Sequence, residues 1–268
     1  MDKQQILKKL NNDGDKILVA RMFDLINKST MINTVETTDF LDMRNQLLLE
    51  KILKQIKFKY YVFCGGIEEA ERKLLIFYPE KLEDIFQNKY YNFNNIMDVI
   101  KIKLNKEEIG KYSHRTYLGA LMKLGIKRDK IGDIIVDEYG ADIICKDICK
   151  FLQNNLRTLK RFSKSEIRKI DLAEIRKLQN HTEKISIILP SMRLDSIVSE
   201  LAHTSRIKSI EILKQERVLV NFQIETKSSK NINEGDIITI RGKGRFKIIK
   251  KLNYTKKGNL LVEVEKFI

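Results

Sequence analysis

Apolar residues recur at helical spacing through the first 56 residues of the chain. Stripes with three- or four-residue steps lie within residues 6–10, 17–26 and 47–56, the period of an α-helix with one buried face. Residues 27–33 are largely polar and indicate a loop between the second and third stripes. The pattern predicts a small helical module at the start of the chain.

Strand and helix signals alternate in the middle of the chain. The segment 57–63 is rich in aromatic residues, and Gly65-Gly66 then turns the chain. Short apolar or alternating segments predict strands at 74–78, 96–104, 131–136, 141–145 and 185–189, and amphipathic segments predict helices at 117–124 and 148–159. This interleaving indicates an α+β or α/β middle domain, and it leaves the order of the strands open.

Residues 193–268 combine two short helices with a strand-rich tail. Two buried helix faces are expected, one made of Leu194, Ile197, Val198 and Leu201 and the other of Ile207, Ile210 and Leu213. Thr204-Ser205 stands where a hydroxyl can cap the second helix. Strands are expected at 218–220, 237–240, 246–252 and 260–264, with a turn at 234–236 and a hairpin turn at 256–259.

The charge of the chain points to a polyanionic partner. Lys and Arg number 51 against 36 Asp and Glu, which gives a net charge of +15. A bias toward AT-rich codons raises lysine, but it raises glutamate as readily, so it does not explain the surplus. A positive field of this size favours nucleic acid or an acidic membrane surface. The alternative to a polyanionic partner is that these charges lie on helix faces that contact only solvent.

The positive charge is concentrated in two segments. Residues 146–177 contain ten basic and four acidic side chains, and residues 193–268 contain sixteen and nine. The three cysteines, an odd number, predict no disulfide framework and a cytoplasmic location. The start of the chain shows no signal sequence, no apolar run is long enough to span a bilayer, and the histidines are scattered. The sequence therefore predicts a soluble protein with no metal and no cofactor.

A set of short motifs in the C-terminal part resembles the alpha-L RNA-binding domain of ribosomal protein S-four. These motifs are Arg193-Leu194-Asp195, Glu200-Leu201, Ser205-Arg206, Arg217-Val218-Leu219-Val220-Asn221 and Glu234-Gly235-Asp236. One departure is Phe222, where the family commonly has glycine. Amides at the start of the second helix suit phosphate. Contacts to RNA are expected from Arg193, Ser205, Arg206, Lys208, Arg217, Asn221, Lys227, Lys230, Arg241, Lys243 and Arg245.

Motifs in the rest of the chain resemble the bacterial YlmH family. They are Phe63-x-Gly65-Gly66, Ala70-Glu71-Arg72, His114-Arg115, Leu118-Gly119-Ala120, Leu124-Gly125-Ile126-Lys127-Arg128 and Ile131-Gly132-Asp133-Ile134. The resemblance implies an α+β protein with a helical N-terminal domain (1–72), an RNA-recognition-like middle domain (73–185) and an alpha-L RNA-binding domain with a C-terminal hairpin (186–268).

The resemblance also implies a function. It implies work in the cytoplasm on rRNA of the large ribosomal subunit, in quality control of stalled nascent chains, with peptidyl-tRNA as a further partner. A link to cell-division-site placement has also been attached to the family. We expect a monomer that binds no membrane.

The main alternative is an RNA-modifying enzyme with its active site in the middle domain. Asp195 stands in a tripeptide similar to that of pseudouridine synthases, but it continues into a helix, where it suits the first turn. His114 has no carboxylate or nucleophile placed beside it by the sequence. Tyr60, Tyr61 and Phe63 could stack on bases, although core packing is favoured for two of them. We therefore expect no catalytic residues and no enzyme.

Overall fold

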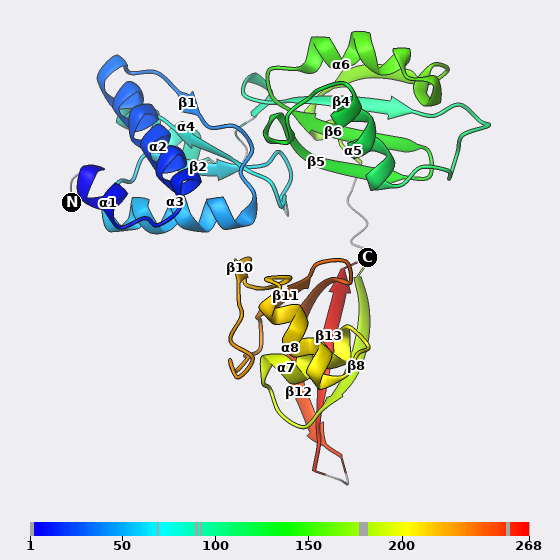
Figure 1. Ribbon diagram of the computed structural model, residues 1–268. Coiled ribbons are helices and arrows are strands. Elements are labelled where there is room, and N and C mark those ends of the chain that lie inside the picture. The colour runs from blue at the N-terminus through cyan, green and yellow to red at the C-terminus, as the bar shows by residue number, and fades with distance from the viewer. Residues whose placement is uncertain are drawn as a thin grey trace. The chain divides into compact units, whose positions relative to one another are not determined.

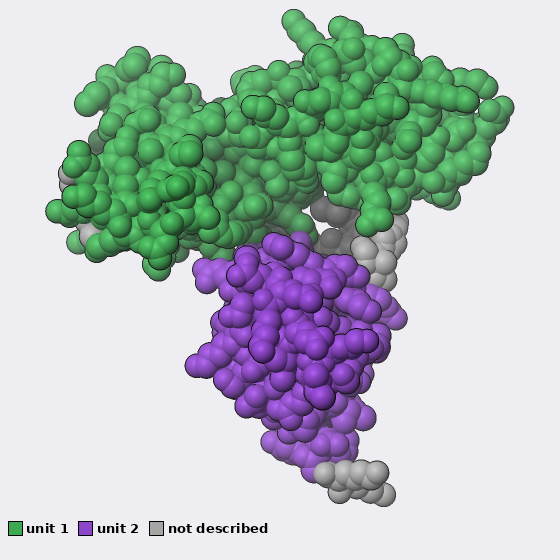
Figure 2. Space-filling view, viewed as in Figure 1, with its two compact units in different colours: residues 1–178 green, residues 179–268 purple. Residues whose placement is uncertain are grey.

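Helices and strands alternate along the chain, which confirms an α+β protein (Figure 1). The computed structural model describes residues 3–68, 70–88, 91, 93–176, 182–255 and 258–267. The chain divides into two units, residues 1–178 and 179–268, coloured separately in Figure 2. Each unit has its own hydrophobic core.

Three helices open the first unit: α1 (Lys3–Lys8), α2 (Asp13–Ile32) and α3 (Met43–Gln55). The side chain of Asn12 caps α2, and that of Asp42 caps α3. The expected loop at 27–33 is wrong, because α2 continues through its polar residues to Ile32. It ends where Asn33 takes a left-handed conformation, with φ of 57°.

A three-stranded antiparallel sheet follows, which the helical pattern did not predict as part of this module. Its order is β1 (Glu36–Thr37), β3 (Leu74–Phe77) and β2 (Tyr61–Cys64). The strand expected at 74–78 is thus confirmed, and the aromatic segment 57–63 supplies its partner β2. The boundary expected between residues 72 and 73 falls between β2 and β3, which pair from Tyr61↔Phe77 to Cys64↔Leu74.

The larger sheet of this unit contains β4 (Asp98–Lys103), β5 (Ile131–Asp137), β6 (Gly140–Cys145) and β7 (Glu166–Ile170). Helix α5 (His114–Lys123) connects β4 to β5, and α6 (Cys149–Asn155) lies between β6 and β7. The sheet order is β5-β6-β4-β7, all antiparallel. This is the β-α-β-β-α-β sequence of split βαβ folds. Short helical segments lie at Glu80–Leu82, Glu83–Gln87, Phe93–Asn95, Arg128–Lys130, Leu156–Thr158, Lys160–Phe162 and Leu172–Glu174.

The two faces of this larger sheet are covered differently. Ile100, Ile102 and Ile143 lie on the face packed against α5 and α6, in one core cluster with Tyr117 and Leu152. The neighbouring residues in each strand point to the other face, because side chains alternate along a strand. That face packs against the three-stranded sheet. Its cluster combines Val99, Ile135, Ile144 and Ile170 with Leu74, Ile76 and Tyr78. The first unit therefore contains three hydrophobic clusters: one on each face of the larger sheet, and a third between the N-terminal helices and the three-stranded sheet.

The second unit is a six-stranded sheet with two helices on one face. In chain order it contains β8 (Thr182–Leu189), α7 (Leu194–Leu201), α8 (Arg206–Lys214), β9 (Val218–Val220), β10 (Gln223–Ile224), β11 (Ile237–Ile240), β12 (Gly244–Tyr254) and β13 (Leu260–Phe267). The sheet order is β10-β9-β11-β12-β13-β8. The expected helices and the hairpin of β12 and β13 are confirmed, and residues 256 and 257 of its turn lie outside the described residues.

Two expectations for this unit are wrong in detail. The strand expected at 185–189 exists, but it belongs to this sheet and not to the middle of the chain, since β8 pairs with β13 along its whole length. The boundary expected between residues 185 and 186 therefore falls inside β8. Ile207 is 75% exposed, whereas the neighbouring helical position Ser209 is fully buried, so the buried edge of α8 does not include Ile207.

Candidate nucleic-acid interface

A buried carboxylate holds two of the predicted RNA-contact residues together in the second unit. The side chain of Asp195, in the first turn of α7, is only 2% exposed. Nη2 of Arg193 lies 2.9 Å and Nη2 of Arg206 lies 3.0 Å from the same Asp195 oxygen, Oδ2. Hydrogen bonds, first from Arg193, lower the pKa of Asp195. The two guanidinium groups are half exposed, so they present fixed positive charge at the starts of α7 and α8.

The first turn of α8 is accessible. The Ser205 hydroxyl accepts a hydrogen bond from the Lys208 amide at 3.3 Å, so Ser205 is the helix cap that the sequence predicts. Ser205, Arg206 and Lys208 are all exposed, and a helix start with free amide groups favours anions. These three residues therefore form one surface with Arg193, which we call the α8 surface.

A loop brings two further predicted lysines to the start of α7. The Leu194 amide donates to the carbonyl of Lys230 at 2.9 Å, and the Asp195 amide donates to that of Ser228 at 3.1 Å. The ammonium group of Lys230 lies 2.9 Å from Glu225, whose pKa it lowers, whereas Lys227 is exposed. Lys227 and Lys230 thus lie on the loop that packs beside Arg193.

A second group of predicted residues lies where β9 begins and β11 ends. Nη2 of Arg217 donates to the carbonyl of Arg241 at 2.9 Å, and the Arg241 amide donates back to the Arg217 carbonyl at 2.9 Å. Gly242 and Gly244 have φ of 83° and 131° around the exposed Lys243. The Gly242-Lys243-Gly244 segment is therefore a turn with cationic side chains around it.

Asn221 and Arg245 do not join these groups. The Asn221 amide group donates to Asp236 at 2.8 Å and its oxygen accepts from the Ile237 amide at 2.9 Å, so the side chain connects the end of β9 to the start of β11. Arg245 precedes Phe246, which is buried against the helices, and alternation places Arg245 on the opposite face of the sheet. Its guanidinium group lies 5.5 Å from the centre of the Phe222 ring.

The turn at Asn221-Phe222 explains the departure from glycine at that position. Both residues have positive φ, 48° and 66°, and they connect β9 to β10 as a two-residue hairpin loop in which glycine is usual at the second position. The Phe222 ring instead contributes a cation–π contact to Arg245, which also lies 5.9 Å from the Phe267 ring. We infer that this contact offsets part of the backbone strain.

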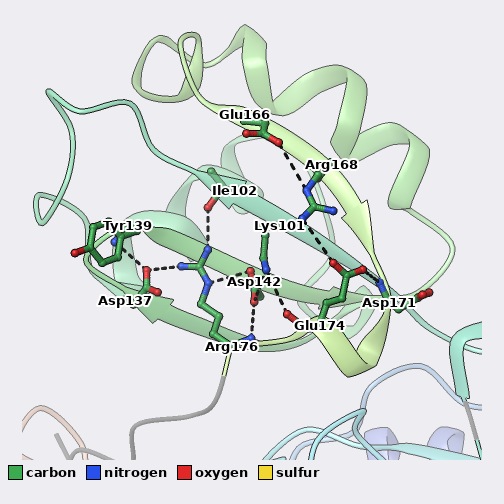
Figure 3. A network of polar contacts seen from close by, with 10 residues as sticks. All are labelled: Lys101, Ile102, Asp137, Tyr139, Asp142, Glu166, Arg168, Asp171, Glu174 and Arg176. Carbon is green, nitrogen blue, oxygen red and sulfur yellow. Dashed lines mark hydrogen bonds and ion pairs between the residues drawn. The ribbon is translucent and has the colours of Figure 1, made fainter.

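A polar network that the sequence did not reveal lies on the larger sheet of the first unit (Figure 3). Asp142, in the middle of β6, has no exposed surface. The Arg176 amide donates to its Oδ2 at 2.8 Å, and Nε of Arg176 lies 3.0 Å from its Oδ1. Arg176 also pairs with Asp137, and Lys101 donates to the carbonyl of Glu174 at 3.2 Å. A single aspartate in an otherwise apolar strand was the signal for this network.

Two of the motifs that resemble the YlmH family, Ala70-Glu71-Arg72 and Ile131-Gly132-Asp133-Ile134, form a structural joint in the first unit. Arg72 donates through Nε to the carbonyl of Ile131 at 2.9 Å and through Nη2 to that of Phe40 at 2.8 Å. Asp133 accepts from the amides of Glu71 and Arg72 at 2.7 and 3.1 Å, although burial raises its pKa. These contacts connect the three-stranded sheet to β5 and assign the motif residues to packing.

Other candidates from the sequence take structural positions. Tyr60, Tyr61 and Phe63 pack against the two cores that adjoin the three-stranded sheet. His114 is the first residue of α5 and is exposed. Cys145 and Cys149 are buried thiols, and no group of three or more potential metal ligands lies within the described residues. No described helix has both the length and the apolar character needed to cross a bilayer.

The Asp195 ion pairs predict a pH dependence for the second unit. Because the folded-state pKa of Asp195 is lowered from 3.8, its contribution to stability is full above the unfolded-state pKa and is lost as pH falls through the folded value. We expect Asp195→Asn to lower the free energy of unfolding by about 2 kcal/mol at pH 7 and by much less at pH 2. Thermal unfolding at both pH values measures this, and an equal loss at both would contradict it.

Comparisons with known proteins give the following similarities. The family model described as "Putative RNA-binding domain in YlmH" matches residues 89–174. Over 236 residues, 87% of either chain, the sequence is 31% identical to the ribosome-associated protein quality control protein P2 of Bacillus subtilis (strain 168). A solved structure, the cell division protein ylmH from Streptococcus pneumoniae, is 20% identical with a TM-score of 0.48, covering 63% of this chain and 98% of that one.

Proposed function

Since this chain belongs to the YlmH family of RNA-binding proteins, we propose that it binds rRNA and tRNA of the large ribosomal subunit without catalysing a reaction. We propose further that it acts in the cytoplasm in quality control of stalled nascent chains, with peptidyl-tRNA as one partner. Support comes from the curated relative, whose name places that protein in ribosome-associated quality control.

The observation that supports RNA as the ligand is the α8 surface. A buried Asp195 orients Arg193 and Arg206, and Ser205 and Lys208 extend the surface along the first turn of α8. Guanidinium groups held in place lose little entropy on meeting a phosphate and can bind it through two donors. A surface of this kind reads the sugar-phosphate backbone and the shape of folded RNA rather than its base sequence.

Replacing Arg206 and Lys208 with glutamine is expected to weaken binding to purified large ribosomal subunits. Each lost phosphate contact should reduce the log–log salt dependence by about 0.7 to 0.9. Glutamine is used because a glutamate at Arg206 would face the Asp195 carboxylate. Co-sedimentation of the full-length protein with subunits at several salt concentrations measures the effect.

The matched control removes two charges from elsewhere in the same unit. Lys184→Gln with Lys250→Gln affects two exposed lysines that both pair with Glu263, and it should leave the salt dependence unchanged. Equal weakening by both pairs would show a nonspecific charge effect and would contradict the assignment of the α8 surface. Nucleosides of the bound RNA, analysed by mass spectrometry, should be unaltered.

A further inference from the structure

The face of the larger sheet that lies opposite α5 and α6 is not available to RNA in this protein. In RNA-recognition folds, aromatic side chains on the two central strands stack on bases. Here the central strands are β6 and β4, and their outward-facing residues include no aromatic side chain: they are Val99, Lys101, Lys103, Gly140, Asp142 and Ile144. Val99 and Ile144 are fully buried beneath the three-stranded sheet.

The rest of that face is closed by the segment after β7. Residues 171–176 cross it, as Figure 3 shows, and Arg176 binds the buried Asp142. Lys101 is held by the carbonyl of Glu174, and Leu172 and Ile175 pack into the core beneath. A base could reach this face only if this segment came off the sheet.

The opposite side of the same fold carries five exposed cations, most of them without an acidic partner among the described residues. No aspartate or glutamate occurs between residues 148 and 165, whereas Lys150, Arg157, Lys160, Arg161 and Lys164 do. All five are exposed. Lys164 lies 3.4 Å from Glu107, but within the described residues no carboxylate lies within ion-pair distance of the other four. Such a cluster repels itself unless a polyanion binds to it.

An exposed aromatic ring lies on the same helix as the first of these cations. Phe151 is 44% exposed, although α6 buries Cys149, Leu152 and the following Leu156 against the sheet. Phe151 neighbours Lys150 in the sequence, and the exposed Asn154 lies one turn away. An exposed ring next to an amide, on a helix that also carries an exposed cation, is suited to stack on an unpaired base while phosphates are neutralised.

A hollow adjoins the same surface. It has a volume of about 470 Å³ and is lined by Asn105, Glu107, Glu108, Tyr112, Lys160, Arg161, Ser163 and Lys164. Its size falls within the range of sites that hold small organic groups. The two glutamates are already engaged, Glu107 near Lys164 and Glu108 by the Tyr112 hydroxyl. Lys160, Arg161 and Lys164 thus line an open depression on the same side of the fold.

We propose that this fold binds RNA through the side formed by α6 and the two short helical segments after it. Its α6 surface consists of Lys150, Phe151, Asn154, Arg157, Lys160 and Arg161. The ligand is an unpaired stretch of RNA, with a base stacked on Phe151 and phosphates on the cations. The proposal rests on the proposed RNA-binding function and assigns it a second site, separate from the α8 surface.

The test measures binding of a fluorescent RNA hairpin with an unpaired loop to the full-length protein at several salt concentrations. Lys150→Gln with Arg157→Gln should reduce the log–log salt slope by about 1.5. Phe151→Ala should weaken binding at least about fivefold without changing that slope, because stacking releases no counterions. The matched control, Lys103→Gln with Arg168→Gln, removes two charges from the face of the sheet that lies opposite α6. It should change neither the affinity for the RNA nor the salt slope. Thermal unfolding checks that every variant is folded.

The possible outcomes separate this proposal from the proposed function. If Arg206→Gln with Lys208→Gln weakens binding while the α6 variants do not, the α6 surface is refuted and the RNA-binding function stands. If none of these variants weakens binding, both fail. A lower slope in the control pair with no change in the α6 pair would place RNA on the sheet face. Loss of binding to phosphatidylserine vesicles, with RNA affinity unchanged, would make the α6 surface a membrane site and overturn the proposal.

Discussion

Asp142→Ala is expected to lower the free energy of unfolding of the first unit by about 3 to 5 kcal/mol. The substitution leaves the Arg176 guanidinium group, which is only 14% exposed, without the buried carboxylate that neutralises it. The charge would then keep only the half-exposed Asp137 as an acidic partner, or it would pull the segment 171–176 off the sheet. Urea unfolding, combined with amide hydrogen exchange of β6, would detect the loss and locate it.

Asp137→Ala is the matched control for this prediction. Asp137 pairs with the same Arg176 side chain but is 43% exposed, and exposed ion pairs contribute only about 0 to 1 kcal/mol. A double substitution, Asp142→Leu with Arg176→Leu, should recover part of the stability, because a buried ion pair can be replaced by well-packed apolar groups. Equal losses for Asp142→Ala and Asp137→Ala would refute the role given to the buried carboxylate.

Arg72→Ala is expected to lower the free energy of unfolding of the same unit by about 3 kcal/mol. Arg72 makes two short hydrogen bonds to carbonyls, and a hydrogen bond to a charged group contributes about 1.5 kcal/mol or more. The carbonyl of Phe40 would lose its guanidinium donor, and the carbonyl of Ile131 would keep the hydrogen bond from Arg128. Arg72→Lys should lose most of the same stability, since an ammonium group lacks the fork that reaches both carbonyls. Chemical denaturation of the three proteins would measure this.

Arg115 provides the comparison for Arg72. It belongs to another of the motifs that resemble the YlmH family, but it is exposed in the first turn of α5. Arg115→Ala should therefore change stability by less than about 0.5 kcal/mol. A large loss at Arg115, or none at Arg72, would mean that the motif residues do not form the joint described above.

Local signals in the sequence were sufficient for much of the second unit. The spacing of Leu194, Ile197, Val198 and Leu201 defined α7, and all four side chains are buried. Ser205 caps α8 as its position predicted. These features depend on residues a few positions apart, which periodicity and capping rules describe. Six of the predicted contact residues, Arg193, Ser205, Arg206, Lys208, Lys227 and Lys230, lie on the α8 surface or on the loop beside it.

Features that depend on distant parts of the chain could not be predicted in this way. Strand β7 has only two buried positions, Ile167 and Ile170, within a basic run, so it shows no alternation. The partner of Asp142 is thirty-four residues away, and nothing near Asp142 indicates that it is Arg176. Arg245 was predicted as an RNA contact with Arg241 and Lys243, although strand alternation sends its side chain to the other face of the sheet.

The pairing of β8 with β13 has a consequence for how the protein is made. Thr182–Leu189 is synthesised early in its unit, yet its hydrogen-bonding partner, Leu260–Phe267, is the last strand in the chain order. A polypeptide that stops before Leu260 would leave β8 and β12 as open edges with isoleucine side chains, which invite aggregation. We therefore expect the second unit to be soluble only when Leu260–Phe267 has been synthesised. Copies that end before Leu260 should be recovered in inclusion bodies or degraded.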